Sequence, residues 1–358
     1  MTRLKDKPLD FSGHTISLGI DSHLKTYKVC YFVDDLYYKT ISHPADVKSL
    51  YSYLTTNFPN GNYQSAYEAG FSGFKLHKEL IKLGVNNIVV HASDVPMSDK
   101  NKEQKTDKRD AKQIARCLVG GLLEGIYIPS EEQIADRSLL RYRDKIVSDL
   151  TRQRNRIKMH LYFTGIEVPE EYQGSNWSRA FVSWLASLSF SNLSSHQTLE
   201  LMLKQLKDNQ GLLLEVNRLL RSMSNRPNYS TNYQLLISIP GIGPVGALRI
   251  LTEIGDIQRF ETEQALCSYA GLIPNSNSSG PREVKSRITY RANKKLRWQL
   301  IEASWVAIRA DPSLALYYSK KVKQTQNKNK AIVRVARKLL CRIRAVLIKQ
   351  EKYVLNKS

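Results

Sequence analysis

The fold class follows from a segment that opens with Thr15-Ile-Ser-Leu-Gly-Ile-Asp21, a short apolar run that ends on an acid. From Tyr27 to Val33, apolar and polar residues alternate with period two, which indicates a second strand, and Leu36 to Ile41 can form a third. The step Val33-Asp34-Asp35-Leu36 is typical of a hairpin turn. We therefore predict three consecutive strands that pair as hairpins.

Helix and strand patterns alternate after these strands. Apolar spacing predicts, in order, a helix over 44–57, a strand over 63–67, a helix over 71–83, a strand over 87–92, a polar loop over 93–104 and a helix over 106–118. Strands that alternate with helices in this way fit a mixed sheet with helices on its faces. The ribonuclease-H-like fold has this element order, and we predict an α/β domain of that class over residues 12–125.

The rest of the chain is predicted to be helical. Two apolar stripes at helical spacing, separated by a break at Gly165–Gly174, predict an antiparallel helical pair over 126–228. The pair is either a coiled-coil surface for a second copy or an intramolecular spacer. A compact helical domain follows over 229–310, and a basic helical tail over 311–358. The amphipathic helix 331–349 of this tail turns basic side chains either to solvent or to nucleic acid.

The charge of the chain points to a polyanionic partner. Its 358 residues include 54 lysines and arginines against 33 acids, a formal net charge of +21, and nucleic acid is the first candidate partner. The sequence lacks both a membrane-spanning apolar run and the apolar core of a signal peptide, so we expect a cytoplasmic protein without a membrane partner. The four cysteines lie far apart and indicate neither a zinc site nor disulfides.

Four acids form the first candidate site. Lys105-Thr-Asp107-Lys-Arg-Asp110-Ala111 places two carboxylates three residues apart, on one face of a helix. Asp21 and Glu68 end two predicted strands, so the sheet and the following helix can bring all four acids together. Oxygen donors of this kind favour Mg²⁺ or Mn²⁺, and a pair of such ions assists phosphodiester cleavage. The basic neighbours would hold a polyanion nearby: Lys105, Lys108 and Arg109. The alternative is a solvated helix face of alternating charge.

Two further motifs lie in the predicted helical domain. The run Pro240-Gly-Ile-Gly243 resembles a helix-hairpin-helix turn, in which Gly241 and Gly243 allow the backbone to approach a DNA phosphate; the alternative is a plain turn between helices. The segment from Gly271 to Gly280 contains Ser278 and Ser279. It is either a flexible loop or the carrier of a serine nucleophile. Basic residues that could bind phosphate follow it: Arg282, Lys285, Arg287, Arg291, Lys294 and Arg297.

Taken together, these motifs resemble one known family. The chain is similar to the DEDD transposases of bacterial insertion sequences, whose members join a RuvC-like domain to a C-terminal transposase domain. The matching segments span nearly the whole chain: Gly19–Asp21, Tyr67–Gly70, Lys105–Ala111, Pro240–Gly243, Gly271–Gly280 and Asn293–Arg297. One departure is Tyr290-Arg-Ala-Asn293, where the family usually has Lys-x-Gly-Asn.

The resemblance implies a function and its site residues. The family's catalytic, metal-binding acids fall on Asp21, Glu68, Asp107 and Asp110, and its nucleophile falls on Ser278 or Ser279, of which we favour Ser279. The resemblance also implies a covalent serine–phosphate intermediate, a structured guide RNA, and a homo-dimer or homo-tetramer that acts on element ends and target DNA at the bacterial nucleoid. Two alternatives remain open: a RuvC-like nuclease that cuts DNA junctions with water, and a non-catalytic nucleic-acid scaffold.

Overall fold

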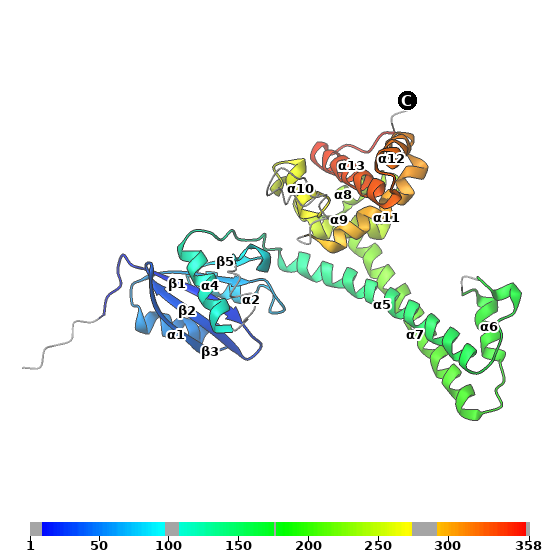
Figure 1. The fold of residues 1–358 in the computed structure, drawn as a ribbon, viewed down its shortest axis with the longest axis horizontal. Coiled ribbons are helices and arrows are strands. Elements are labelled where there is room, and N and C mark those ends of the chain that lie inside the picture. The colour runs from blue at the N-terminus through cyan, green and yellow to red at the C-terminus, as the bar shows by residue number, and fades with distance from the viewer. Residues whose placement is uncertain (1–8, 97–106, 175–176, 274–291, 356–358) are drawn as a thin grey trace, which may run out of the picture. The chain divides into compact units, whose positions relative to one another are not determined.

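The computed structural model describes residues 9–96, 107–174, 177–273 and 292–355. The chain divides into two compact units, residues 1–128 and residues 129–358 (Figure 1). The described strands all lie in the first unit, and the second unit is helical in its described part. The α/β plus helical class is therefore confirmed, while the ribonuclease-H-like assignment and the four-part division stay predictions.

A five-stranded mixed sheet forms the first unit, in the order β3-β2-β1-β4-β5. Its members are β1 (Thr15–Ser22), β2 (Thr26–Val33), β3 (Leu36–Pro44), β4 (Asn62–Glu68) and β5 (Asn86–Val90). β2 pairs antiparallel with β1 and β3, whereas β4 pairs parallel with β1 and β5. All five predicted strands are confirmed. The predicted hairpin turn places Asp34 at φ 53°, a left-handed conformation that aspartate tolerates better than most residues.

The two faces of the sheet pack on different helices. Ile16, Leu18 and Ile20 of β1 are fully buried in a core with α1 (Val47–Asn57) and α2 (Lys75–Lys82). Because side chains alternate along a strand, Gly19 and Asp21 lie on the opposite face. That face is covered by α4 (Asp107–Val119), which packs on β1 and β2.

Helix starts differ from the predicted ones by a few residues. α1 begins at Val47 rather than near Pro44, because the Asp46 carboxylate accepts the Ser49 amide at 2.7 Å and caps the helix there. α2 begins at Lys75, later than predicted. Ser93 and Asp94 of the predicted polar loop belong to a 3₁₀ turn, η1 (Ala92–Asp94), and residues 97–104 lie outside the described residues.

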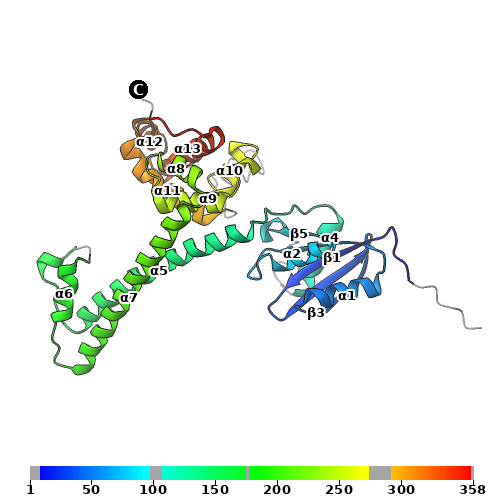
Figure 2. The ribbon, with the colours of Figure 1, turned by 180° about the vertical axis from the view of Figure 1, so that it is seen from behind.

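Two long helices open the second unit. α5 (Glu131–Phe163) packs against α7 (Leu193–Ser224), with η2 (Glu170–Tyr172) and α6 (Arg179–Ser187) between them in sequence (Figure 2). Arg143, early in α5, bonds to Asn217, late in α7, at 2.8 Å. His160, late in α5, contacts the Ser195 carbonyl, early in α7, at 3.1 Å. The predicted antiparallel pair is therefore confirmed, and its coiled-coil association stays a prediction.

The remaining helices build a bundle around one core. They are α8 (Ser230–Ile237), α9 (Pro244–Ile254), η3 (Ile257–Arg259), α10 (Glu263–Tyr269), α11 (Lys294–Ala310), α12 (Pro312–Thr325) and α13 (Lys328–Lys349). α13 packs on α8, α10, α11 and α12. Its predicted inward residues are all buried: Ile332, Val335, Leu339, Ile343 and Val346. None of the described helices is both long and apolar enough to cross a membrane.

Candidate functional site

Two of the predicted acids end neighbouring parallel strands. The register of β1 with β4 runs up to the residues just before Asp21 and Glu68, so these two acids lie at matching positions at the carboxyl ends of the strands. Asp21 lies on the same face of the sheet as Gly19, and Glu68 on the same face as Ala66. Ala66 packs against α4. Both carboxylates therefore belong to the face that α4 covers.

α4 touches this face directly at Gly19. A Cβ on Gly19 would stand 2.2 Å from the carbonyl oxygen of Ala111 and 2.3 Å from the amide nitrogen of Ala115, so only glycine permits this approach. Asp110, which is partly buried, immediately precedes Ala111. Asp107 is the first residue of α4, about one helical turn before Ala111. The helix therefore carries Asp107 and Asp110 beside β1, the strand that carries Asp21.

The described acids do not form a metal cluster by themselves, and Asp21 has a protein partner. Asp21 Oδ2 lies 3.2 Å from Nε2 of His23, a residue that the sequence reasoning did not select. Among the side chains that the structure describes, no group of three or more His, Cys, Asp and Glu could hold a metal ion. Asp107 is not among those side chains. The chemistry of the set nonetheless fits a hard divalent cation, because Asp21, Glu68 and Asp110 all offer carboxylate oxygens.

The basic residues around these acids are only partly described. Lys105 lies outside the described residues, as does the side chain of Lys108. Arg109 is exposed. The prediction that these three residues hold a polyanion therefore stays a prediction.

The serine motif and most of its basic companions lie outside the described residues: Ser278, Ser279, Arg282, Lys285, Arg287 and Arg291. The residues on either side of it are described. The Asn293 amide donates to the Tyr269 carbonyl at 2.9 Å, and Arg297 Nη1 donates to the Gly271 carbonyl at 3.3 Å. The start of α11 is thus bonded to the end of α10 across the serine segment. Lys294 is exposed at this start.

One of the two residues that depart from the family pattern, Ala292, is described, and it packs closely against Gly271. Ala292 stands where the family usually has glycine, and its Cβ lies 2.2 Å from the point where a Cβ on Gly271 would be. Gly271 has φ 69°, a conformation that favours glycine. The extra methyl group at 292 is therefore accommodated against a glycine. Tyr290 lies outside the described residues.

The predicted helix-hairpin-helix turn joins α8 to α9. Gly241 has φ 88°, and a Cβ there would stand 2.2 Å from the Ala303 carbonyl oxygen of α11, so packing against α11 accounts for this glycine. Gly243 is exposed at the N-cap of α9, with nothing near the position of a Cβ. Of the two glycines, only Gly243 is thus open to a phosphate.

Two basic residues of α13 are engaged inside the bundle. Arg342 Nη1 lies 2.6 Å from Asp311 Oδ2. Arg344 Nη2 donates to the carbonyls of Phe260 and Glu261 at 3.0 and 2.9 Å. These arginines bind protein groups, which weakens the interpretation of α13 as a surface for nucleic acid.

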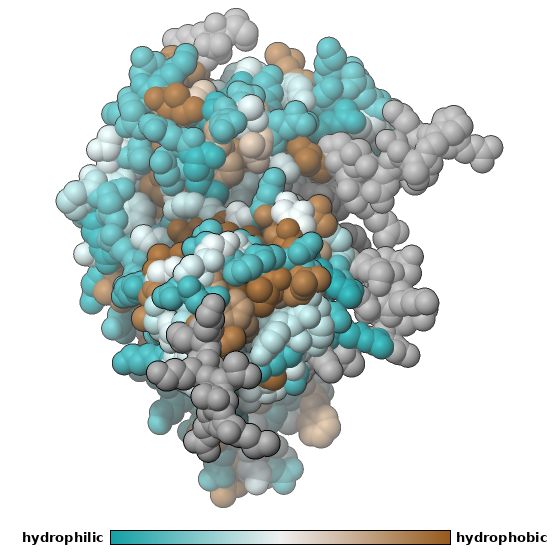
Figure 3. Space-filling view, turned by 90° about the vertical axis from the view of Figure 1, so that its left-hand side faces the viewer, coloured by the Kyte–Doolittle hydropathy of each residue, from teal (hydrophilic) through white to brown (hydrophobic). Residues whose placement is uncertain are grey.

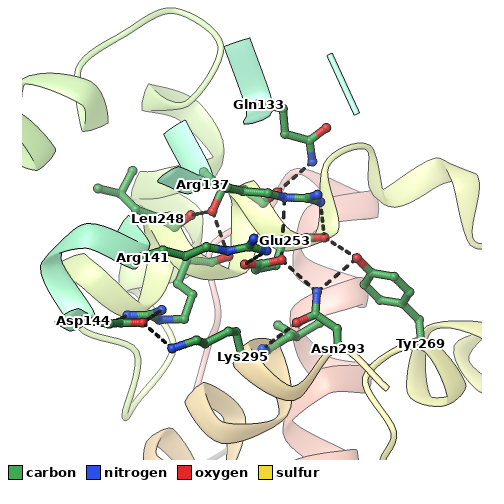
Figure 4. A network of polar contacts seen from close by, with 12 residues as sticks. Gln133, Arg137, Arg141, Asp144, Leu248, Glu253, Tyr269, Asn293 and Lys295 are labelled. Carbon is green, nitrogen blue, oxygen red and sulfur yellow. Dashed lines mark hydrogen bonds and ion pairs between the residues drawn. The ribbon is translucent and has the colours of Figure 1, made fainter. Parts of the chain in front are cut away.

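A buried polar network around Glu253 was not found from the sequence (Figure 4). Glu253 lies in the last turn of α9 and is 3% exposed. Its carboxylate lies 3.6 Å from Nε of Arg137 and 3.5 Å from Nη2 of Arg141, both on α5, and accepts from Nδ2 of Asn293 at 2.8 Å. The one available signal was a single charged residue in the second half of α9, where the other residues are uncharged and mostly apolar.

A second buried ion pair lies beside it, between α9 and α5. Arg249 is 2% exposed and donates to both carboxylate oxygens of Asp144, at 2.8 and 2.6 Å. Lys295 of α11 reaches the same carboxylate at 3.0 Å (Figure 4). Burial raises the pKa of Asp144, but the hydrogen bonds from Arg249 and Lys295 outweigh it and hold the pKa below its usual value. Asp144 is therefore a charged link between three helices.

Family models match both units of the chain. A model of DEDD transposases of the IS110 type matches residues 18–165, which include all four acids. A model described as transposase IS116/IS110/IS902 family matches residues 233–319, which include both serines and Asn293.

Several named relatives also match. The transposase for insertion sequence element IS1533 of Leptospira borgpetersenii is 26% identical over 81% of this chain and 84% of its own. The transposase for IS1111A of Coxiella burnetii is 25% identical over 70% of this chain and 69% of its own. A Sinorhizobium fredii protein named as a transposase is 26% identical, and the match covers 73% of this chain and 62% of the relative, less than two thirds of its length.

Matches in both units, with the acids at the strand ends of a mixed sheet, assign the chain to the DEDD transposases, a class of DNA-rearranging enzymes. Within that class it belongs to the IS110 family of insertion-sequence transposases. Membership implies that the protein binds DNA and suggests that it depends on a divalent metal.

Proposed function

We propose that the chain moves its own insertion element in an RNA-guided reaction, in which Ser279 attacks DNA and four acids hold Mg²⁺ or Mn²⁺. The first unit would then be RuvC-like, with a ribonuclease-H-like fold. The observation that carries the proposal is the placement of Asp21, Glu68 and Asp110 on strand ends and on the helix packed against them. Family matches over both units support it.

The acids would act as a set. Asp21, Glu68, Asp107 and Asp110 would hold the cation, which when bound would stabilise negative charge that develops on a phosphate. The chain's own contribution is orientation, because Gly19 lets α4 approach β1 and so fixes Asp110 relative to the strand ends. Carboxylates brought close together repel one another without a counter-charge, so a bound cation would be needed to hold the four acids as a set.

The serine reaction conserves the number of phosphate ester bonds. Ser279 Oγ attacks the phosphorus of a DNA phosphodiester, and its proton passes to a carboxylate or water. One bridging P–O bond breaks, and its oxygen takes up a proton from that carboxylic acid or water and leaves as a DNA hydroxyl. A hydroxyl of another DNA end then attacks the phosphoserine, which frees Ser279 and rejoins the DNA. No external energy source is needed. Ser278 is the neighbouring candidate for the same role.

Two partners belong to the proposal. A structured guide RNA would select element ends and target DNA at the nucleoid, and the net charge of +21 supports a polyanionic partner. A homo-dimer or homo-tetramer would carry out the exchange. Large hydrophobic residues exposed on the α5–α7 pair support association with a second copy: Met159, Tyr162, Phe163, Leu193 and Leu201.

Serine substitutions test the reaction. In cells that carry the element with its natural flanking DNA, we expect Ser279→Ala to abolish recombination. The wild-type protein should leave a covalent protein–DNA adduct after denaturation, and Ser279→Ala should not. Ser276→Ala, in the same segment, is the matched control and should recombine normally. Full recombination by both Ser278→Ala and Ser279→Ala would show that the serine mechanism is wrong.

A RuvC-like nuclease that cuts DNA junctions with water is the second candidate, because the same acids could activate water without a serine. Wild-type cleavage without an adduct would favour it. Asp110→Asn should abolish reaction in both cases. Undiminished DNA rearrangement by that variant would instead leave only a non-catalytic role for the acids.

A further inference from the structure

Asn293 makes contacts in three directions at the point where the serine segment joins α11. Its Oδ1 accepts the Leu296 amide at 3.0 Å and caps the helix. Its own amide donates to the Tyr269 carbonyl at 2.9 Å. Its Nδ2 donates to Glu253 Oε2 at 2.8 Å and to the Tyr269 hydroxyl at 3.1 Å. The position therefore needs an acceptor and a donor on one short side chain, which asparagine supplies and aspartate does not.

Glu253 is held from several sides. Besides the contacts of its carboxylate, its carbonyl accepts from Arg137 Nη2 at 3.0 Å and from the Tyr269 hydroxyl at 2.8 Å. Arg137 Nε and Gln133 Nε2 both donate to the neighbouring carbonyl of Thr252, each at 2.7 Å. These bonds satisfy carbonyls at the end of α9 that have no partner within the helix. Figure 4 shows the network converging from three segments onto this one helix end.

Stability alone gives a weak reason for such a network. A buried charge is costly to desolvate, and well-packed apolar side chains of similar volume often serve a core equally well or better. A fully bonded polar network, by contrast, admits few alternative arrangements, because each displaced group loses its partner. Its distinctive benefit is that it fixes the positions of the groups it joins.

We infer that Asn293 and Glu253 are positioning residues for the serine reaction: the buried Glu253 carboxylate holds Asn293, and Asn293 holds the end of α10 to the start of α11. The segment that contains Ser279 follows the end of α10 in the sequence and precedes the start of α11. The inference rests on the proposed serine function. Neither residue contacts DNA in this scheme; both act through the segment they anchor.

Asn293→Asp tests the inference sharply. Aspartate caps a helix as well as asparagine does, but it removes the donor and places a second carboxylate against buried Glu253. We expect the rate of serine–DNA adduct formation to fall about 100-fold, the effect of a displacement near 1 Å in a reacting group. DNA binding should be retained. Asn327→Asp is the matched control, because Asn327 caps α13 through the Lys330 amide at 3.0 Å and should keep the wild-type rate.

A reversed pair distinguishes positioning from general loss of fold. In the double variant Glu253→Gln with Asn293→Asp, the glutamine amide can donate to the new aspartate, so the bond is restored with its direction reversed and one negative charge remains. The Tyr269 hydroxyl can turn its proton to that aspartate, because Arg137 still donates to the backbone carbonyl of position 253. We expect the double variant to recover most of the adduct rate that Asn293→Asp loses, with thermal unfolding measured for all variants.

The outcomes separate the inference from the function on which it rests. An adduct in the wild type together with a wild-type rate for Asn293→Asp would overturn the inference alone. So would a double variant that regains its unfolding temperature but not its rate, because the network would then act only on stability. A wild-type protein that recombines without any adduct would overturn the serine function, and the inference with it.

Discussion

Gly19 sets the distance between the sheet and α4. Because glycine has no side chain, the backbone of α4 packs directly on β1. This contact sets the position of Asp110 on α4 relative to Asp21 on β1. One residue thus links a packing requirement to the candidate site. A side chain of any size at this position would have to displace a helix backbone, which cannot turn aside as a flexible side chain can.

Gly19→Ala should therefore destabilise the protein and impair its reaction. We expect a loss of about 1–3 kcal/mol or more in the free energy of unfolding, the cost of overpacking a core, measured by urea denaturation. Gly211→Ala is the control, because Gly211 lies within α7 with open space around its Cβ position and should gain up to about 1 kcal/mol from helix propensity. Equal stability of Gly19→Ala and wild type would contradict the close contact.

The candidate-site residues whose place in the fold could be predicted are those close together in sequence or at the ends of strands. Asp21 and Glu68 could be found because strand ends are readable from apolar runs, and Asp107 and Asp110 because their spacing is helical. Glu253 could not be found, because its partners Arg137 and Arg141 come from α5, more than 100 residues earlier. Long-range polar pairing leaves no periodic signal in a sequence.

At the scale of elements, Asp311 joins α12 to α13 and to the chain beyond it. It caps α12 by accepting the Ser313 and Leu314 amides at 2.9 and 3.1 Å. It also binds Arg342 of α13, and the Tyr353 hydroxyl donates to it. Burial raises its pKa, but the hydrogen bonds from Tyr353, Ser313 and Leu314 and the charge of Arg342 outweigh burial and lower the pKa to about 2.

The lowered pKa predicts a pH dependence with a definite sign. The Asp311 carboxylate stabilises the fold fully above its unfolded pKa of 3.8, and this contribution is lost as the pH falls toward about 2. Asp311→Asn should cost roughly 2 kcal/mol at pH 7, and its difference from wild type should shrink between pH 4 and 2 in urea unfolding. Asp46→Asn is the control: Asp46 caps α1 at an exposed position, so this variant measures the loss of unfolding free energy when an exposed capping aspartate becomes asparagine. A pH-independent difference for Asp311→Asn would contradict the prediction.

Elements were predictable wherever the apolar period was regular. The strands and the long helices follow their patterns, and the inward face of α13 was read correctly from its spacing. The residue at which a helix starts was less predictable. In α1, Pro44 favours a start near its own position, but Asp46 caps the helix and the helix begins at Val47. The engagement of Arg342 and Arg344 inside the bundle was missed, because a basic residue looks the same in sequence whether it meets a phosphate or a carbonyl.

At the scale of the whole molecule, charge is the dominant property. An excess of +21 makes binding to nucleic acid favourable and salt-dependent, because released counterions drive it. Charge cannot distinguish RNA from DNA, and the family matches support only DNA.

Purification from cells that carry the element with its flanking non-coding DNA should yield a discrete structured RNA bound to the protein. With 6–10 phosphates contacted, affinity for that RNA or for element-end DNA should fall by about 10³–10⁵ between 50 and 200 mM salt. Cells without the flanking DNA are the control. Heterogeneous RNA of random sequence, released equally in both cases, would contradict the guide-RNA proposal.

The order of the sheet leaves one side open to strand addition. At the β5 edge, the Ile126 amide donates to the Val89 carbonyl at 2.7 Å, so the chain near Ile126 lies against β5 there. In the part of the chain that the structure describes, no strand pairs with the outer side of β3, which exposes Leu36, Tyr37 and Tyr38. Hydrophobic side chains are visible among hydrophilic ones on the face of the first unit seen in Figure 3.

Such an edge strand is a template on which another chain can extend the sheet, either productively or as the start of aggregation. Two features oppose this: the irregular register at Tyr31/Phe32, which disturbs the flatness of the β2–β3 pair, and the charge of Lys39 within β3. The first unit therefore carries its own protection against self-templated growth. Replacing Lys39 by an apolar residue would remove part of that protection without touching the acids or the serines.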